Sequence, residues 1–175
     1  MPQQWVSVLR HDRCNDPDKR ADLQPSAWCL LDAGDGAQLR GGDGACEIHG
    51  AANTLGFSVD IVRPVNKNSE SFSPADWLDV LTAIDTACAS DAEGVVVLHG
   101  TDTMHYTLAA AGCFIGSKRV CFTGAMVSPE LEGSDAHINL LAAMSFAADD
   151  AYNAGVYLAF CDNADRLSAT DMCVA

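Results

Sequence analysis

The sequence predicts an α/β fold in which a parallel sheet is flanked by helices, giving three layers. The first observation is a continuous apolar run at residues 95–98, which is typical of a central parallel strand buried on both faces. The second is that strand-like and helix-like segments alternate from residue 55 onward with short connections. The third is composition, since 49% of the 175 residues are apolar and can form a proper core.

The charge and cysteine content exclude several classes of protein. The formal net charge is -14, which argues against binding to nucleic acid or to an anionic membrane surface. No segment approaches the ~20 apolar residues of a membrane span, and the N-terminus lacks a signal-peptide core. The eight cysteines are scattered singly without a CxxC pair, so neither a zinc site nor a redox motif is indicated. We expect a reduced cytoplasmic protein, with Cys113 and Cys121 buried as small apolar residues.

The first 54 residues are the least regular part of the chain. Residues 1–54 are rich in Asp, Gly, Arg and Pro, with candidate strands at residues 5–9 and 27–31. The GGDG string at residues 41–44 matches neither common phosphate-binding pattern and is predicted to be a turn. We therefore divide the chain into a divergent N-terminal segment and an α/β domain over residues 55–175.

The α/β domain begins with a strand and a well-marked helix. Residues 57–62 alternate like a strand, which Pro64 is predicted to end before a polar loop at residues 66–71. Ser73 and Asp76 have the spacing of a capping box, with a proline at the first helical position. Helical spacing then predicts one buried stripe, formed by Trp77, Leu78, Leu81, Ile84 and Cys88.

The remaining segments repeat the same alternation. The pattern predicts a helix that starts after Ser134 and ends at Gly155, and a polar tail from residue 161. The other predicted elements are a strand at 94–98, a helix at 104–115, and strands at 119–123 and 156–160.

Three polar loops follow strands of this predicted sheet. They span residues 66–71, 99–103 and 124–133. Because right-handed crossovers bring the carboxyl ends of parallel strands to one edge, we expect the three loops to meet there. Ligands bind at that edge in open α/β sheets, so the loops are the candidate site.

The segment Thr101–Thr103 has two possible roles where a strand ends and a helix begins. Asp102 or Thr103 can act as a plain N-cap, accepting from free N–H groups of the first helical turn. Alternatively, the hydroxyl and the carboxylate bind a ligand at the sheet edge. For a generic Thr-Asp-Thr the cap is favoured; the longer string HGTDTM favours the ligand.

The strings LHGTDTMHYT and RVCFTGAMVSPELEGSDAHINLLAAMSFA resemble the bacterial-type L-asparaginases of the asparaginase/glutaminase family. The earlier string VNKNSESFSPADWLDVLTAI resembles the same family, so the likeness covers about residues 55–168 in register. The resemblance implies an N-terminal asparaginase domain that hydrolyses the side-chain amide of L-asparagine to aspartate and ammonia. It also implies catalysis by threonine hydroxyls without a metal or cofactor.

The resemblance also assigns residues to the site. Thr101 matches the family's second catalytic threonine, and Asp102 matches the aspartate that binds the substrate ammonium within a Thr-Lys-Asp relay. Ser69 matches the serine that holds the substrate carboxylate, with Asn68 beside it as a further substrate-binding residue. Ala125 matches a position whose backbone carbonyl faces the amide. Two of them also have plainer readings, Ser69 as a loop serine and Ala125 as a small residue in a tight turn.

Three features of the family pattern have no counterpart here. The family's TGGTI string, which carries the usual nucleophile, is absent, and alanine occupies the lysine position, at Ala169. A smaller C-terminal domain is also without a match in the 175 residues. Two functions therefore stay open, an amidohydrolase with impaired catalysis and a non-catalytic relative that binds an amino acid or a protein. The expected partners are a small amide substrate and, as an open alternative, further copies of the chain.

Overall fold

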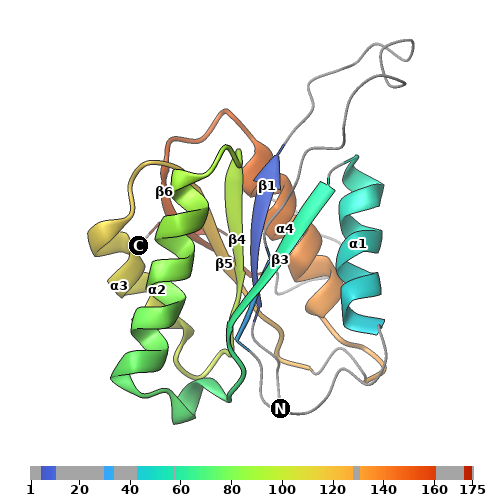
Figure 1. Cartoon of the computed structure of the whole chain (residues 1–175). Coiled ribbons are helices and arrows are strands. Elements are labelled where there is room, and N and C mark those ends of the chain that lie inside the picture. The colour runs from blue at the N-terminus through green and yellow to red at the C-terminus, as the bar shows by residue number, and fades with distance from the viewer. Residues whose placement is uncertain are drawn as a thin grey trace.

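The computed structural model describes residues 5–10, 30–33, 43–56, 58–127, 131–160 and 172–174. These ranges form one seven-stranded sheet with helices on both faces (Figure 1). The strands are β1 Trp5–Arg10, β2 Leu30–Ala33, β3 Ser58–Val65, β4 Gly94–Leu98, β5 Arg119–Thr123, β6 Gly155–Ala159 and β7 Met172–Val174. The helices are α1 Asp43–Leu55, η2 Ser69–Ser71, α2 Pro74–Ala89, α3 Met104–Phe114 and α4 Ala136–Ala148.

The sheet has the order β2-β3-β1-β4-β5-β6-β7. Strands β4, β5 and β6 are parallel to one another, and β2 is parallel to β3. Strand β1 is antiparallel to both β3 and β4, so β3 and β4 run in the same direction. The predicted α/β fold, a parallel sheet flanked by helices, is confirmed. The antiparallel direction of β1 was not predicted, nor was the antiparallel strand β7.

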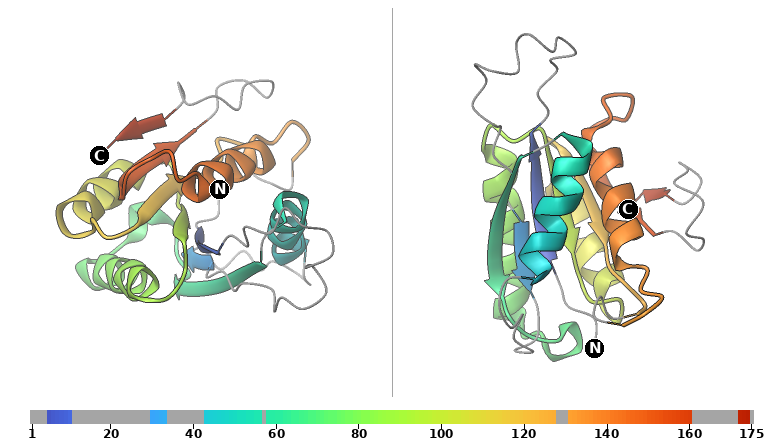
Figure 2. Two further views of the ribbon diagram at one scale, coloured as in Figure 1. Left: turned by 90° about the horizontal axis from the view of Figure 1, so that it is seen from above. Right: turned by 90° about the vertical axis from the view of Figure 1, so that its right-hand side faces the viewer.

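The helices form one layer on each side of the sheet. Helices α2 and α3 cover one face and α1 and α4 cover the other (Figure 2). Side chains alternate between the faces along β4, as the pleat requires. Val95 and Val97 belong to the core cluster under α2 and α3, whereas Val96 and Leu98 belong to the cluster under α1 and α4. All of β4 is buried, which confirms the two-sided burial predicted from its apolar run.

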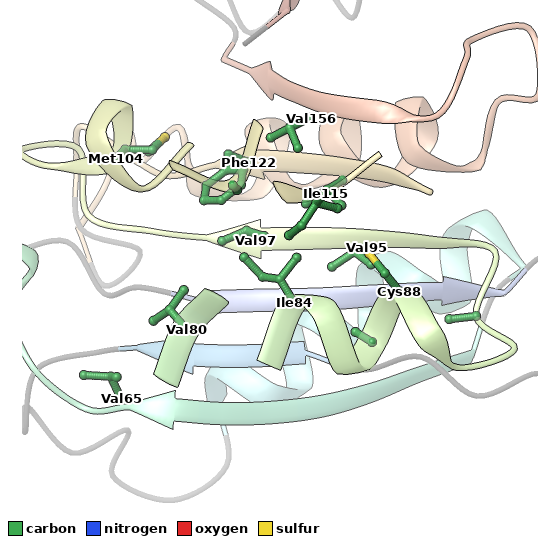
Figure 3. Packing of buried hydrophobic residues seen from close by; sticks show 14 residues of the cluster. Val65, Val80, Ile84, Cys88, Val95, Val97, Met104, Ile115, Phe122 and Val156 are labelled. Atoms are coloured by element: carbon green, nitrogen blue, oxygen red, sulfur yellow. The ribbon is translucent and has the colours of Figure 1, made fainter. Parts of the chain in front are cut away.

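The cluster under α2 and α3 shows how the helices are held to the sheet. Ile84 points from α2 toward Val97 and Val95 of β4, and Phe122 of β5 lies beside them (Figure 3). Ile84 and Phe122 are fully buried. This cluster packs the start of α3 and the carboxyl end of β4 against the same buried core.

Several predicted boundaries are corrected. Pro64 does not end the strand, because β3 continues to Val65. The pairing of β2 with β3 shifts register between Leu31 and Ala33, and Pro64 lies opposite this irregularity, where its missing N–H costs no ladder bond. Phe57 and residues 27–29 lie outside the described residues.

The segment 1–54 contributes more structure than its composition suggested. The candidate strand at residues 5–9 is confirmed as β1, and the second candidate is found slightly later, as β2. The predicted turn at residues 41–44 is wrong for Asp43 and Gly44, which open helix α1. In α1, Ile48 is buried with Ala51 and Ala52 in the cluster that also holds α4. The division at residue 54 stays a prediction.

The ends of α4 also differ from the prediction. Asp135, not Ser134, is the N-cap residue, and the helix ends at Ala148. Gly155 does not end α4 but opens β6, with φ 158° and its N–H donating to Lys118 O. The polar tail carries strand β7, and residues 161–171 lie outside the described residues.

The predicted stripe of α2 is wrong at one position. Leu78 is 65% exposed, whereas Val80, Ile84 and Cys88 are buried. The stripe is therefore rotated, because α2 packs against β3 and β4 through the row that contains Val80 and Ile84. Cys113 was also expected to be buried but is exposed, while Cys121 is buried as predicted.

No helix within the described ranges is both long enough and apolar enough to cross a lipid bilayer.

The corrected stripe predicts unequal costs for two truncations on α2. Ile84→Ala should lower the free energy of unfolding by about 2–5 kcal/mol, because it leaves a cavity in the core. Leu78→Ala should change it by less than about 0.5 kcal/mol, since most of that side chain is already in water. Urea unfolding of both variants measures the difference. Equal costs would contradict the burial of Ile84 and the exposure of Leu78.

Candidate functional site

The three polar loops predicted to converge follow strands β3, β4 and β5, which run in the same direction. His99 links them at the carboxyl end of β4. Its backbone N–H donates to Thr123 O at 2.8 Å, and its ring meets the Phe72 ring edge-on at 5.5 Å between centroids. Phe72 directly follows the first loop, so the predicted meeting of the loops at one sheet edge is confirmed.

Gly124 makes the closest approach between two of these loops. A Cβ atom placed on Gly124 would lie 2.5 Å from His99 O and 2.7 Å from Met104 Cε. The same atom would lie 3.6 Å from Thr101 Cγ2, so Thr101 is a neighbour of the turn after β5. Only glycine fits here, because no real side chain tolerates such a contact with a backbone oxygen.

The ring of His99 is completely buried and has a partner on each nitrogen. Nδ1 lies 2.9 Å from Gly100 O, and a carbonyl only accepts, so Nδ1 carries the proton. Nε2 therefore accepts from the Thr107 hydroxyl at 2.8 Å. Burial lowers the pKa of His99 to about 4, with the Gly100 bond opposing this only in part. His99 is thus a packing residue, and the ring also fixes the backbone just before Thr101.

The first loop carries Asn68 and Ser69. Ser69 is buried and opens the short helix η2, whereas Asn68 is half-buried and makes no side-chain cap bond there. Lys67 anchors the loop to α2 through two bonds to the Asp76 carboxylate, at 2.7 and 2.8 Å. The Lys67 ammonium and Ser73 lower the pKa of Asp76 to about 2. The predicted capping box of Ser73 and Asp76 is confirmed.

The second loop carries Thr101 and Asp102. Thr103 is the N-cap residue of α3, but its side chain makes no cap bond. Asp102 is exposed, and its carboxylate has no hydrogen bond or ion pair with any residue that the structure describes. The plain capping role is therefore wrong for both residues. Thr101 is half-buried beside Asp102, which leaves a hydroxyl and a carboxylate available at the sheet edge.

The third loop carries Ala125, which is 5% exposed. The start of α4 holds this turn from one side. Asp135 accepts from Met126 N and Val127 N, both at 3.0 Å through Oδ1, and from Asn139 Nδ2 at 2.9 Å through Oδ2. Asn139 is fully buried and donates to Gly124 O at 2.8 Å. The turn is thus rigid although it lies outside the sheet.

The edge combines groups that suit a small zwitterion. Asp102 offers a negative charge, Thr101 a hydroxyl, and Ala125 backbone groups in a fixed turn. A positively charged amino group pairs with a carboxylate through a charge-assisted hydrogen bond. Among the described residues no group of three or more His, Cys, Asp or Glu side chains is placed to hold a metal ion.

Sequence analysis did not assign a role to Asp135 or Asn139. Both belong to the SDxxxNL string that supported the family resemblance, so the signal was visible as a motif. Their function is to bond the turn that follows β5. The spacing of residues within α4 does not reveal these bonds, because the turn belongs to another part of the chain. Lys67 was missed for the same reason, because its partner Asp76 lies in the next element.

One known family and several known proteins resemble this chain. The family described as "Asparaginase, N-terminal" matches residues 36–172. One of the subunits of glutamyl-tRNA(Gln) amidotransferase from Thermoplasma acidophilum is 38% identical over 112 residues, which cover 62% of this chain and 27% of that protein. The corresponding protein of Nanoarchaeum equitans is 37% identical over 95 residues, which cover 53% of this chain and 24% of that protein.

Two solved structures share the fold with detectable sequence identity. The thermostable L-asparaginase from Thermococcus kodakarensis gives a TM-score of 0.60 at 31% identity, over 69% of this chain and 36% of that chain. L-asparaginase I from Vibrio cholerae gives 0.51 at 34% identity, over 59% of this chain and 31% of that chain. This chain thus spans about a quarter of the curated relatives and about a third of the solved chains.

The buried ring of His99 predicts a pH dependence of stability. The neutral ring is kept in the folded state down to about pH 4, whereas an unfolded histidine has a pKa of about 6.5. The stabilisation is therefore complete above about pH 6.5 and is lost as the pH falls toward 4, by about 1.4 kcal/mol per pH unit.

Urea unfolding between pH 7 and pH 4 measures this loss. His99→Gln should have a shallower slope than the wild type in that window, because the titrating ring is gone. The matched control His137→Gln, at an exposed position of α4, should keep the wild-type slope. A His99→Gln slope equal to that of the wild type would contradict burial of the neutral ring.

Proposed function

The chain belongs to the asparaginase family, and we propose that it binds L-asparagine at the carboxyl edge of its sheet as part of an amidohydrolase. The reaction is hydrolysis of the side-chain amide to L-aspartate and ammonia. The chain spans only about a quarter of the length of its curated relatives, so the activity of the whole protein is itself a proposal.

The main support is the exposed, unpaired carboxylate of Asp102 beside the half-buried Thr101. A carboxylate at a helix start usually caps the helix, and this one does not. Its oxygens, without a partner among the described residues, therefore suit the α-ammonium group of an amino acid. Ser69, with Asn68 beside it, would hold the substrate α-carboxylate from the first loop, and the Ala125 carbonyl would face the side-chain amide.

The chemistry is acyl transfer, in which a hydroxyl attacks the amide carbon and ammonia leaves. Thr101 carries a half-buried hydroxyl beside Asp102 at this edge. An activated hydroxyl needs a general base, and no described Lys or His side chain bonds to Thr101. We therefore propose slow hydrolysis by this chain alone, because a nucleophile and its base contribute many powers of ten together.

Two alternatives have specific support. The curated relatives carry the name amidotransferase, which favours glutamine as the amide that is hydrolysed. The Thr101 hydroxyl is bonded to no general base among the described residues, which favours a non-catalytic domain that binds an amino acid. Ammonia release from L-asparagine and from L-glutamine separates these functions, since a binder releases none and the two enzymes differ in substrate.

The proposed role of Asp102 predicts a loss of binding without a loss of stability. Asp102→Asn should weaken the binding of L-aspartate and L-asparagine by about ten- to a hundredfold, since a charge-assisted hydrogen bond is worth roughly 1.5–3 kcal/mol. Its unfolding free energy should be unchanged, because the carboxylate has no partner among the described residues. Titration calorimetry and urea unfolding measure the two quantities.

Asp79→Asn is the matched control, since Asp79 is also exposed but lies on α2. It removes one charge from the chain without touching the loops, so both affinities should stay at wild-type values. If Asp102→Asn and Asp79→Asn bound L-aspartate equally well, Asp102 would have no part in the site.

A further inference from the structure

Asp135 occupies the N-cap position of α4 but does not cap the helix with its side chain. Aspartate is among the best N-cap residues, because its side-chain oxygen can accept from a free N–H group of the first turn. Here the carboxylate accepts from Met126 N and Val127 N of the preceding turn and from Asn139 Nδ2 of the helix. The Ser134 hydroxyl accepts from Ala136 N at the helix start instead, so the Asp135 carboxylate is left to hold the turn.

The start of α4 holds several backbone groups of the turn. Gly124 O is bonded to Asn139 Nδ2, and Val127 O accepts from the Ser134 hydroxyl at 2.9 Å. Met126 N and Val127 N are both bonded to Asp135. We call Ser134, Asp135 and Asn139 the turn clamp.

Ala125 lies in the middle of the clamped turn. Neither its N–H nor its carbonyl has a hydrogen-bond partner among the described residues, although its side chain is 5% exposed. The groups on both sides of it are fixed to α4, so the orientation of the Ala125 peptide is set by the clamp. A fixed carbonyl that has no partner in the described part of the chain can accept from a ligand N–H.

We propose that Asp135 and Asn139 are positioning residues that aim the Ala125 carbonyl at the side-chain amide of the ligand. This inference rests on the proposed function. The carbonyl only accepts, so it bonds to the NH₂ of an amide and repels the oxygens of a carboxylate. The turn clamp therefore sets the preference for the amide substrate over the carboxylate product.

The test compares the affinities for L-asparagine and L-aspartate by titration calorimetry on the full chain. The readout is the dissociation constant for aspartate divided by that for asparagine. Asp135→Asn keeps the shape of the side chain but loses its charge and faces the Asn139 amide with an NH₂ group. The ratio should fall about tenfold, because one charge-assisted contact to the turn is lost.

Two further variants accompany Asp135→Asn. Ser134→Ala removes the hydroxyl bond to Val127 O and the bond that the hydroxyl accepts from Ala136 N, at a half-buried position, and should lower the ratio by a smaller factor. Tyr157→Phe is the matched control, since it removes one bond, to Asn153 O, far from the turn. Its ratio should equal that of the wild type.

Unchanged ratios in Asp135→Asn and Ser134→Ala would overturn the inference while leaving the proposed function intact. So would an equal fall in Tyr157→Phe, because it would show a general effect of lost stability. If Asp135→Asn does not fold, the ratio of Ser134→Ala decides alone. Failure of the wild-type chain to bind either amino acid would overturn the proposed function itself.

Discussion

The hydrogen bond from His99 N to Thr123 O, at 2.8 Å, is the contact on which the site depends. It extends the pairing of β4 with β5 one step beyond the last residue of β4. The loops after the two strands therefore begin side by side. Gly124 lies so close to His99 O that any side chain would separate them. This contact keeps Thr101 close to the turn at Ala125, which the start of α4 also holds.

The residues at this sheet edge fall into two groups, those that hold the loops in place and those that are accessible to a ligand. His99, Asp76 and Asn139 are buried and bonded, and each holds one of the three loops against the sheet or a helix. Asp102 and Thr101 are the groups left open to a ligand. Such an arrangement suits binding, because the supporting bonds fix the loops before the ligand arrives. The charge of Asp102 stays available since no other described residue pairs with it.

The sequence predicted those features that depend on neighbouring residues. Residues 95–98 read as a buried strand because burial on both faces leaves no polar alternation, and the capping box of Ser73 lies within one turn of helix. Helix α1 was missed because Gly41–Gly44 and its Asp resemble a turn, and its buried face is defined by α4 and the sheet, which lie elsewhere in the chain. The roles of Lys67 and Asp135 were missed because their partners lie in other elements.

The central claim is that the three loops form one amino-acid site at the carboxyl edge of β3, β4 and β5. Mapping amide chemical shifts by NMR during titration with L-asparagine tests it most directly. We expect saturable shifts at residues 68–69, 101–102 and 125–127, because these backbone groups surround the bound amino acid. Residues 90–93 and 116–118, which precede β4 and β5 at the opposite edge, should not move. Shifts confined to that opposite edge, or no shifts at all, would contradict the claim.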